Sequence, residues 1–361
     1  MKDLVTPSIE RLVPYQGGKP IEELAREKGL SDIVKLASNE NPLGPSPLAV
    51  AAAMRALENV HRYPDGAAHR LRSAIATFHG VQLAEVIHGN GSNELLELAV
   101  RTFTTPAHHI VFGTPGFSMY PVIAGAHGVA YTAVPTTSDL VHDLGALLAA
   151  IRPETRLLIL DNPNNPTGTY VPEPLLADFL RQVPEQVVVV LDEAYFEFAD
   201  APDYPNGLLL RHLRERLIVL RTFSKAYGLA GFRVGYGIGP KGLMDYINRL
   251  RAPFNVGVPS HEAGIAALAD TEHLAQSVAL NRIERRFISE GLEPLAVRVY
   301  PSQTNFVLAD FERPSAELYE QLLDRGVIVR PIPGLPHSLR TSIGTRAENE
   351  RFLAALSEVC R

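Results

Sequence analysis

The sequence predicts an α/β protein in which a mostly parallel sheet flanked by helices forms a large domain, followed by a smaller α+β domain. Its 361 residues amount to two to three units of the roughly 150 residues typical of one domain. Short aliphatic runs recur between longer segments of helical period, which is the pattern of strands and crossover helices. Neither an internal repeat nor a Gly/Ser-rich or Pro-rich linker divides the chain, so we expect the domains to share a helix.

The strands of the large domain are predicted from β-branched and aliphatic runs, and its helices from the spacing of apolar positions between those runs. A helical crossover between successive strands favours a parallel sheet. The predicted strands are 85–88, 109–112, 157–161, 187–192, 217–221 and 234–238. The predicted helices or loop-plus-helix crossovers are 94–103, 120–126, 173–182 and 206–214.

The last part of the chain has a shorter pattern. A long, charged, amphipathic stretch is predicted as a helix at 273–290, and short strands then alternate with helices. This pattern indicates the smaller α+β domain. Its predicted strands are 298–300, 306–309, 327–329 and 339–343, and its predicted helices are 316–325 and 347–359.

Composition and charge exclude several functional classes. With 46% hydrophobic residues, 20% charged residues and a net charge of -6, the chain is expected to be folded and mildly acidic. Its 34 basic residues are outnumbered by 40 acidic ones, so we expect no nucleic-acid partner. The apolar runs are too short to span a membrane, and Cys360 is the only cysteine, so no disulfide or thiolate metal cluster forms within the chain. We expect a cytoplasmic protein without a membrane partner or a bound metal.

Polar and charged residues follow the predicted strands where each strand ends. A glycine turn at 89–91 opens a helix whose free N–H groups attract an anion such as a phosphate. A loop stiffened by prolines presents Asn165 after another strand. Asp192 and Tyr195 follow the next strand, and Lys225 follows the one after it. Because ligands bind beyond the carboxyl ends of such strands, we expect these groups to share one site.

This combination meets the requirements of pyridoxal phosphate. A buried Lys225 has the neutral amine that a Schiff base needs, and Asp192 keeps the ring nitrogen protonated so that the ring accepts electrons. Asn165 and Tyr195 supply hydrogen bonds to the ring hydroxyl, and Arg233 supplies a bidentate partner for the phosphate. Each segment alone is better explained as a cap, a turn or a surface group. Their order on consecutive strand ends favours the joint functional interpretation.

The motifs also carry a resemblance to a known family. Asn-Pro-Thr-Gly at 165–168, Asp-Glu-Ala-Tyr at 192–195 and Thr-Phe-Ser-Lys at 222–225 resemble the fold-type I pyridoxal-phosphate aminotransferases over nearly the whole chain. Within this family the chain resembles the histidinol-phosphate aminotransferases in segments 37–42, 61–65, 89–95, 223–235, 251–256 and 303–306 and at Pro14 and Tyr15. The implied domains are an N-terminal arm with part of the small domain at 1–40, a large cofactor-binding domain at 41–275 and a small domain at 276–361.

The resemblance implies a role for each matching residue. The catalytic group is expected to be Lys225 as the Schiff-base lysine, Asp192 at the ring nitrogen and Tyr195 at the ring hydroxyl. The cofactor is further expected to contact Asn165 at the hydroxyl, Phe117 on the ring face, and Ser92, Asn93, Thr222, Ser224 and Arg233 at the phosphate. Tyr63 is expected to reach the phosphate in the neighbouring subunit of a homodimer. The expected substrate contacts are Tyr15, Asn165, Arg330 and Arg340.

The implied activity is transfer of an amino group between L-histidinol phosphate and 2-oxoglutarate. Three departures from the subfamily pattern, Phe117, Gly257 and the loop 331–336, lie at the substrate end, so aminotransfer from phenylalanine or tyrosine stays open. A lyase similar to threonine-phosphate decarboxylase is a further alternative. A non-enzymatic sensor domain is disfavoured, because the match begins near Pro14 and leaves no N-terminal segment for a DNA-binding module.

Overall fold

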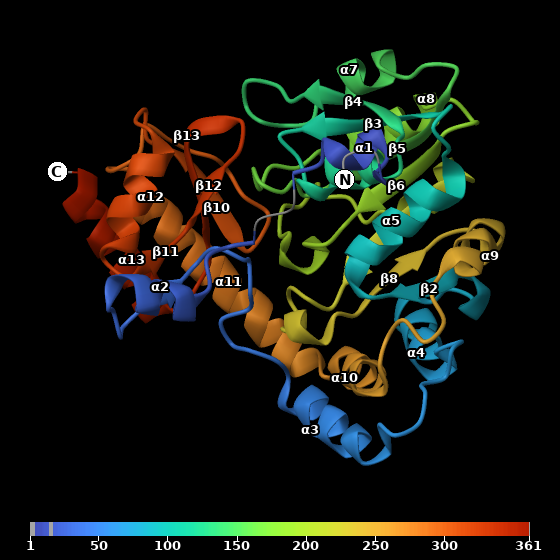
Figure 1. Cartoon of the computed structure of the whole chain (residues 1–361), viewed down its shortest axis with the longest axis horizontal. Helices are drawn as coiled ribbons and strands as arrows, with labels where there is room; N and C mark the ends of the chain where they lie inside the picture. The colour runs from blue at the N-terminus through green and yellow to red at the C-terminus, as the bar shows by residue number, and fades with distance from the viewer. Residues whose placement is uncertain (1–3, 14–16, 361) are drawn as a thin grey trace.

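The computed structural model of the chain describes residues 4–13 and 17–360. Over these ranges the chain forms a large α/β body and a smaller body beside it, and one long helix, α11 (Thr271–Leu292), runs from the first to the second (Figure 1). Within the same ranges no helix combines the length and the apolar character needed to cross a membrane.

The large body is built on a sheet whose described strands run in the order β2-β8-β7-β6-β5-β3-β4. Neighbouring strands pair in parallel except at β8, which is antiparallel to both β2 and β7. The prediction of a mostly parallel sheet is therefore confirmed. The strands are β2 (Val86–Gly89), β3 (His109–Thr114), β4 (Ala130–Pro135), β5 (Thr155–Asp161), β6 (Val188–Asp192), β7 (Leu217–Thr222) and β8 (Gly235–Ile238).

Helices cover both faces of this sheet, as the uninterrupted apolar runs of its central strands require. Alternate residues of β5 and β6 enter two separate cores, so that Ile159 packs with one set of helices and Leu160 with the other. One set is α5 (Gly91–Phe103), α6 (Met119–Ala126) and α9 (Lys241–Leu250), and the other is α7 (Leu144–Ala149) and α8 (Glu173–Gln182). A third core joins the β2 and β8 edge to α3 (Pro47–Ala56), α4 (His69–His79) and α10 (Val258–Ala269).

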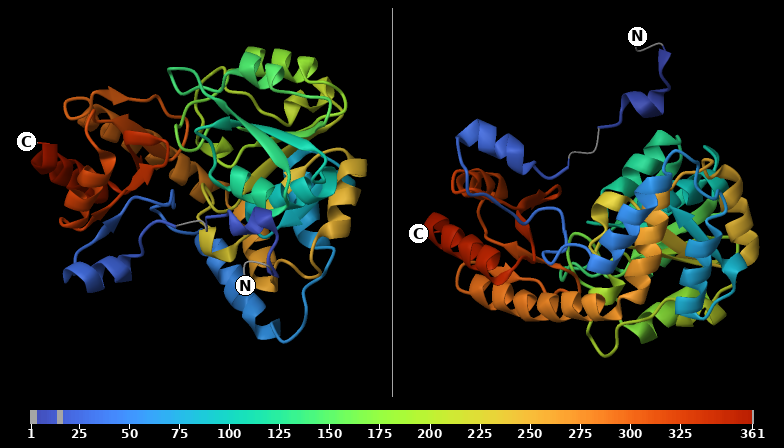
Figure 2. Two further views of the ribbon diagram at one scale, coloured as in Figure 1. Left: turned by 45° about the horizontal axis from the view of Figure 1, so that its top comes forward. Right: turned by 90° about the horizontal axis from the view of Figure 1, so that it is seen from below.

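The smaller body combines the end of the chain with part of its beginning. Among the described strands, β9 (Arg298–Val299), β10 (Phe306–Asp310), β12 (Arg330–Ile332) and β13 (Leu335–Ser342) form an antiparallel sheet. A separate parallel pair joins β1 (Val34–Lys35) to β11 (Val327–Ile328). The helices of this body are α2 (Ile21–Lys28), α12 (Ser315–Leu323) and α13 (Arg346–Cys360), whereas the short α1 (Pro7–Glu10) lies against the large body (Figure 2).

The sequence did not predict the helices α3, α4, α7, α9 and α10, and two further parts of the large body differ from the sequence-based expectation. Segment 206–214 forms the short 3-10 helix Leu209–Leu213 rather than an α-helix, because Gly207 donates its N–H to Glu193 Oε1 and Asn206 Oδ1 accepts from Arg221. These contacts fix the start of the segment against buried side chains. The edge strand β4 was not predicted, since it is mostly exposed and lacks a clear apolar run.

Candidate active site

The carboxyl ends of β5, β6 and β7 meet at one edge of the central sheet. Asp161 and Asp192 are the last residues of β5 and β6 and are register partners, and β7 ends at Thr222. Register partners on neighbouring strands point to the same face, so the two carboxylates are neighbours. This edge faces the smaller body, because Asn39 and Arg340 form hydrogen bonds to groups that follow these strands.

Lys225 lies just beyond β7. Its Nζ donates to the carbonyl oxygens of Ser38 and Asn39, each at 3.3 Å, and lies 5.5 Å from the centre of the Tyr195 ring. Burial, and after it the positive charge of Arg340, lowers the pKa of the Lys225 amine to about 8. The neutral amine is the form that attacks an aldehyde, and a lowered pKa makes more of it available at neutral pH. Lys225 is therefore suited to act as a nucleophile.

Asp192 is a buried carboxylate at the end of β6. Its Oδ1 accepts the N–H of Ala194 at 3.2 Å, and its Oδ2 accepts the hydroxyl of Tyr120 at 3.4 Å. Burial, and after it the negative charge of Asp161, raises the pKa of Asp192 to about 7. A carboxylate destabilised in this way gains strongly from a cationic partner, so Asp192 is suited to bind a protonated ring nitrogen.

Tyr195 presents a protonated hydroxyl to the same edge. Burial raises the pKa of this phenol to about 12, so it keeps its proton and remains able to donate. The Tyr195 oxygen accepts from Asn39 Nδ2 at 2.9 Å. Ser342 orients that amide, because its hydroxyl donates to Asn39 Oδ1 at 2.9 Å and accepts the Asn39 N–H at 2.8 Å. The N-terminal segment and β13 thus fix the phenol of the large body.

Two arginines of the smaller body form the opposite wall of the site. Arg340 Nη1 donates to Asn165 Oδ1 at 2.5 Å, and its Nη2 donates to the carbonyl of Ala37 at 2.9 Å. Its register partner on β12 is Arg330, whose Nη1 donates to the carbonyl of Gly17 at 2.8 Å. Guanidinium groups on adjacent strands favour an anionic ligand such as a carboxylate or a phosphate.

The first turn of α5 forms an anion cradle at the other end of the site. The helix has no side-chain cap, so its first N–H groups can bind an anion. Arg233 adopts a left-handed backbone with φ of 51°, and its Nη1 donates to Ser224 Oγ at 3.3 Å. A Cβ at Gly91 would lie 2.7 Å from Arg233 Nη2, and one at Gly235 would lie 2.6 Å from the backbone nitrogen of Ser92. Glycine is therefore required at 235 by the nearby backbone, and it is favoured at 91 by a left-handed φ of 72°.

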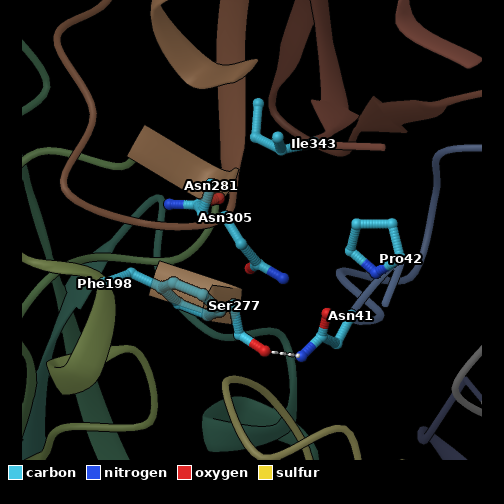
Figure 3. Close-up of a pocket in the computed structure, with 7 residues that line it drawn as sticks. All are labelled: Asn41, Pro42, Phe198, Ser277, Asn281, Asn305 and Ile343. Carbon is cyan, nitrogen blue, oxygen red and sulfur yellow. Dashed lines mark hydrogen bonds between the residues drawn. The ribbon is translucent and has the colours of Figure 1, made fainter. Parts of the chain in front are cut away.

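A small polar cavity lies where the N-terminal segment, α11 and the smaller body meet (Figure 3). Asn41 Nδ2 donates to Ser277 Oγ and to the Ala226 carbonyl, both at 2.9 Å. Asn305 Nδ2 donates at 3.0 Å to the Asn39 carbonyl, which also receives the lysine amine. With a volume of about 10 Å³, the cavity has room for about one water molecule. The cavity is therefore too small for a substrate, and its lining residue Asn305 helps to hold the Asn39 carbonyl that accepts from Lys225.

The structure brings most of the predicted residues to this edge of the sheet. Phe117 is half-buried and packs edge-on against Tyr120, with ring centres 5.6 Å apart. Tyr63 stands apart, because it is 82% exposed and stacks on Phe254 with ring centres 4.7 Å apart. Tyr15 lies outside the described residues. The residues gathered at the edge are Ser92, Asn93, Asn165, Asp192, Tyr195, Thr222, Ser224, Lys225, Arg233, Arg330 and Arg340.

Sequence reasoning missed four groups that shape the site: Asn39, Tyr120, His142 and Asp161. Asp161 ends a predicted strand, so the argument that selected Asp192 could also have selected it. The other three reach the site through contacts with residues distant in sequence, such as the Asn39–Tyr195 contact across 156 positions. A single sequence carries no local signal for such contacts.

Comparison with known proteins supports the motif-based resemblance. Residues 31–356 match the family model described as aminotransferase class I and II. A histidinol-phosphate aminotransferase of Anaeromyxobacter sp. (strain Fw109-5) is 50% identical over 99% of both chains, and one of Akkermansia muciniphila is 49% identical over 96% of both. The crystal structure of histidinol-phosphate aminotransferase from Sinorhizobium meliloti in complex with pyridoxal-5'-phosphate superposes with a TM-score of 0.91 at 31% identity, covering 99% of this chain and 98% of that one. The chain therefore belongs to the aminotransferase class I and II family, and by sequence it groups with relatives named histidinol-phosphate aminotransferase.

Proposed function

We propose that the chain transfers an amino group between L-histidinol phosphate and 2-oxoglutarate with pyridoxal 5'-phosphate as its cofactor. The observation that carries the proposal is the joint placement of Lys225, with an amine pKa lowered to about 8, and Asp192, with a carboxyl pKa raised to about 7, at one buried edge. Relatives at about half identity over the whole length carry the matching name. Substrate and cofactor are thus inferred from two independent kinds of evidence.

The groups present fit this cofactor at three separate points. The helix N-terminus with Ser92, Ser224 and Arg233 fits a phosphate, and the glycines at 91 and 235 leave the space that it needs. Asp192 fits a protonated ring nitrogen, and the half-buried Phe117 fits a ring face. When bound, pyridoxal phosphate supplies an aldehyde for amines and a ring that accepts electrons from the substrate Cα.

The residues of the chain transfer the proton and hold the cofactor in place. With the cofactor bound, the amine Nζ of Lys225 would take the proton from the substrate Cα as a general base and would then give it up again as a general acid. Tyr195 and Asn165 hold the ring hydroxyl, and the carbonyls of Ser38 and Asn39 receive the free lysine amine. Each residue thus binds or moves a proton at a defined position, which is the basis of a two-step amino transfer.

The arginine wall accounts for two different substrates in one site. L-Histidinol phosphate brings a phosphate, whereas glutamate and 2-oxoglutarate bring carboxylates. Arg340 and Arg330, which are register partners on adjacent strands, offer guanidinium donors to either anion. The two substrates occupy the site in turn, so one cationic wall serves both.

The lowered pKa of Lys225 predicts how cofactor capture by the cofactor-free protein depends on pH. The rate should rise with pH and level off above about 8, because the neutral amine is the attacking form. Arg340 lowers this pKa and Glu40 raises it. Arg340→Gln should therefore move the midpoint to higher pH and Glu40→Gln should move it to lower pH, as measured by stopped-flow absorbance. Midpoints that move in the same direction in both variants would contradict this assignment.

We also propose a homodimer in which Tyr63 reaches the partner's phosphate site. Apolar side chains are exposed along α3 and the turn that follows it, including Met54 at 64% and Leu57 at 56%. A second copy would cover such a surface. Tyr63 follows this stretch, and its exposed ring stacks on Phe254.

We also propose a cytoplasmic location, which accords with a chain whose single cysteine allows no disulfide within it.

A shared site predicts complementation between two weak variants. Lys225→Ala inactivates its own site, whereas Tyr63→Ala weakens the site of its partner. Co-refolded heterodimers then carry one intact site, so an equal mixture should recover about a quarter of the wild-type sites, since random pairing makes half of the dimers heterodimers. Activity at limiting cofactor measures this recovery, and sedimentation verifies the dimer. Activity equal to the mean of the two separate variants would mean that Tyr63 acts in its own chain.

The substrate is tested by comparing kcat/KM for L-histidinol phosphate, phenylalanine and tyrosine with 2-oxoglutarate as acceptor. We expect L-histidinol phosphate to be preferred by at least about tenfold, because its phosphate carries more negative charge than the single carboxylate of phenylalanine or tyrosine and so pairs more strongly with Arg330 and Arg340. Preference for an aromatic amino acid would instead support aminotransfer from phenylalanine or tyrosine. Phe117, which stands in place of a more polar residue, makes that activity chemically reasonable. Carbon dioxide release without an oxo acid would support a lyase and overturn the proposal.

A further inference from the structure

A second buried carboxylate stands beside Asp192 and has no part in the proposed reaction so far. Asp161 is only 4% exposed and is the register partner of Asp192 on the neighbouring strand. The strand ends are tied together further, since the N–H of Asn162 donates to the Asp192 carbonyl at 3.0 Å. Asp161 is the charge that most raises the pKa of Asp192 after burial. The two carboxylates therefore affect each other directly.

Three donors converge on the Asp161 carboxylate. His142 Nε2 lies 3.0 Å from Oδ1, Asn164 Nδ2 lies 3.3 Å from the same oxygen, and the N–H of Asn165 donates to Oδ2 at 3.0 Å. Hydrogen bonds of this kind stabilise the ionised form of a carboxyl group. The Asp161 side chain is thus fixed beside Asp192, whose pKa it raises.

His142 is built into this position. Its Nε2 lies 3.0 Å from Asp161 Oδ1, 3.1 Å from the Asp161 carbonyl oxygen and 3.1 Å from Asn164 Nδ2. Because two acceptors of Asp161 face Nε2, we place the proton there; Nδ1 has no hydrogen-bond partner among residues 4–13 and 17–360. A Cβ at position 113 would overlap Nδ1, so the imidazole has room only because glycine stands near the end of β3. The amide of Asn164 is oriented in turn, because its Oδ1 accepts the N–H and the hydroxyl of Thr167. Gly113 and Asn164 therefore hold the His142 ring against Asp161.

The Asp161 carboxylate is also linked to Arg340 through Asn165. Through Oδ2 it fixes the backbone of Asn165, and the side chain of Asn165 accepts from Arg340 at 2.5 Å. Asp161 thus lies between the partner of the ring nitrogen and the arginine that faces the substrate. Asparagine at position 161 would keep an oxygen for the Asn165 N–H but would lose the charge.

We propose that Asp161, held by His142, is a positioning residue of the aminotransferase: its charge lies beside Asp192 and adds to the negative potential that keeps the proton on the cofactor ring nitrogen. This inference rests on the proposed function. Other ionisable groups also act on Asp192 or are acted on by it. Glu193, which is paired with Arg221 at 2.8 Å, raises the pKa of Asp192 as well, but less than Asp161 does. The remaining ones are Tyr120 on α6, Tyr195 and Tyr204 beyond β6, and Lys225 beyond β7. Among these groups, Asp161 is the charge with the largest effect on Asp192.

The first test is a spectroscopic titration of the cofactor-loaded protein. Visible absorbance of the bound cofactor reports its protonation, and removal of a neighbouring negative charge should lower the midpoint by about one pH unit in Asp161→Asn. kcat should fall about tenfold with it, while KM for the anionic substrates should stay within about twofold because the Asn165 contact survives. Asp178→Asn, at an exposed position on α8, is the matched control and should titrate like the wild type.

The second test uses the cofactor-free protein. Since Asp161 raises the pKa of Asp192, ionisation of Asp192 destabilises the wild-type fold as pH rises toward about 7. In Asp161→Asn this loss should shrink, so the melting temperature of the variant should rise relative to wild type between pH 5 and pH 8. A constant difference over that range, together with an unchanged absorbance midpoint, would overturn the inference.

A third variant keeps the inference testable if Asp161→Asn does not fold. His142→Leu removes the donor and should shift the absorbance midpoint in the same direction, whereas His142→Gln, which can still donate, should restore it toward wild type. An unshifted midpoint in folded His142→Leu would contradict the inference. Failure of the wild-type protein to bind the cofactor would instead overturn the proposed function, so the two failures are distinguishable.

Discussion

Replacement of Lys225 by alanine is expected to lower kcat by about 10⁴-fold. The variant loses the nucleophile that holds the cofactor and also the base that moves the Cα proton. Both roles depend on an amine that is buried between the Ser38 and Asn39 carbonyls and the Tyr195 ring. Steady-state kinetics with L-histidinol phosphate and 2-oxoglutarate measures the loss.

A matched control separates this effect from a general effect of removing a lysine. Lys241 is exposed at the start of α9, and Lys241→Ala should keep wild-type activity. The phosphate cradle remains in Lys225→Ala, so the variant should still bind the cofactor without the covalent link. If a folded Lys225→Ala protein turned over at more than about one hundredth of the wild-type rate, another group would have to be the base.

Replacement of Asp192 by asparagine is expected to lower kcat by about 10²-fold to 10³-fold. Asparagine keeps the shape and can still accept the Ala194 N–H, but it has no negative charge for a protonated ring nitrogen. Without that charge the ring is a weaker acceptor for the electrons of the substrate Cα. Single-turnover kinetics, with cofactor binding measured separately, isolates the chemical step.

The same substitution has a signature in the cofactor-free protein. The pKa of Asp192 is raised from 3.8 to about 7 in the fold, so its contribution to stability is fully present below about pH 4 and is lost as pH rises through about 7. Asp192→Asn removes this loss. The melting temperature of the variant should therefore rise relative to wild type between pH 5 and pH 8. A difference independent of pH would show that Asp192 does not titrate in this range.

The placement of the site residues at successive strand ends could be predicted from the sequence, because the strands that precede them are continuous apolar runs. Val188–Asp192 and Leu217–Thr222 are buried throughout, and such runs are visible without any alignment. Since parallel strands end at a common edge, the sequence alone predicts that Asp192 and Lys225 lie near each other. Both ends of the helix at 173–182 were also predicted correctly. Pro172 precedes its first residue, and Val183, in an extended conformation, follows its last residue.

Other parts could not be predicted, for physical reasons. The alanine-rich α3 and α10 pack against each other in the third core, and small apolar residues on most faces leave little helical periodicity. The contacts of Asn39 with Tyr195 and of His142 with Asp161 arise only once the N-terminal segment and the loop before α7 have folded onto the sheet. Tyr63 is 82% exposed in the single chain, so contacts within that chain do not indicate the role that we propose for it in a second copy.

The central claim is that Lys225 is the residue that binds the aldehyde of the cofactor, and chemical trapping tests it most directly. The protein loaded with pyridoxal phosphate is reduced with borohydride and digested, and the modified peptide is sequenced by mass spectrometry. The account predicts one stable cofactor adduct on the peptide that contains Lys225, and none in Lys225→Ala. An adduct on another lysine, or an unmodified Lys225 peptide from a fully loaded protein, would contradict it.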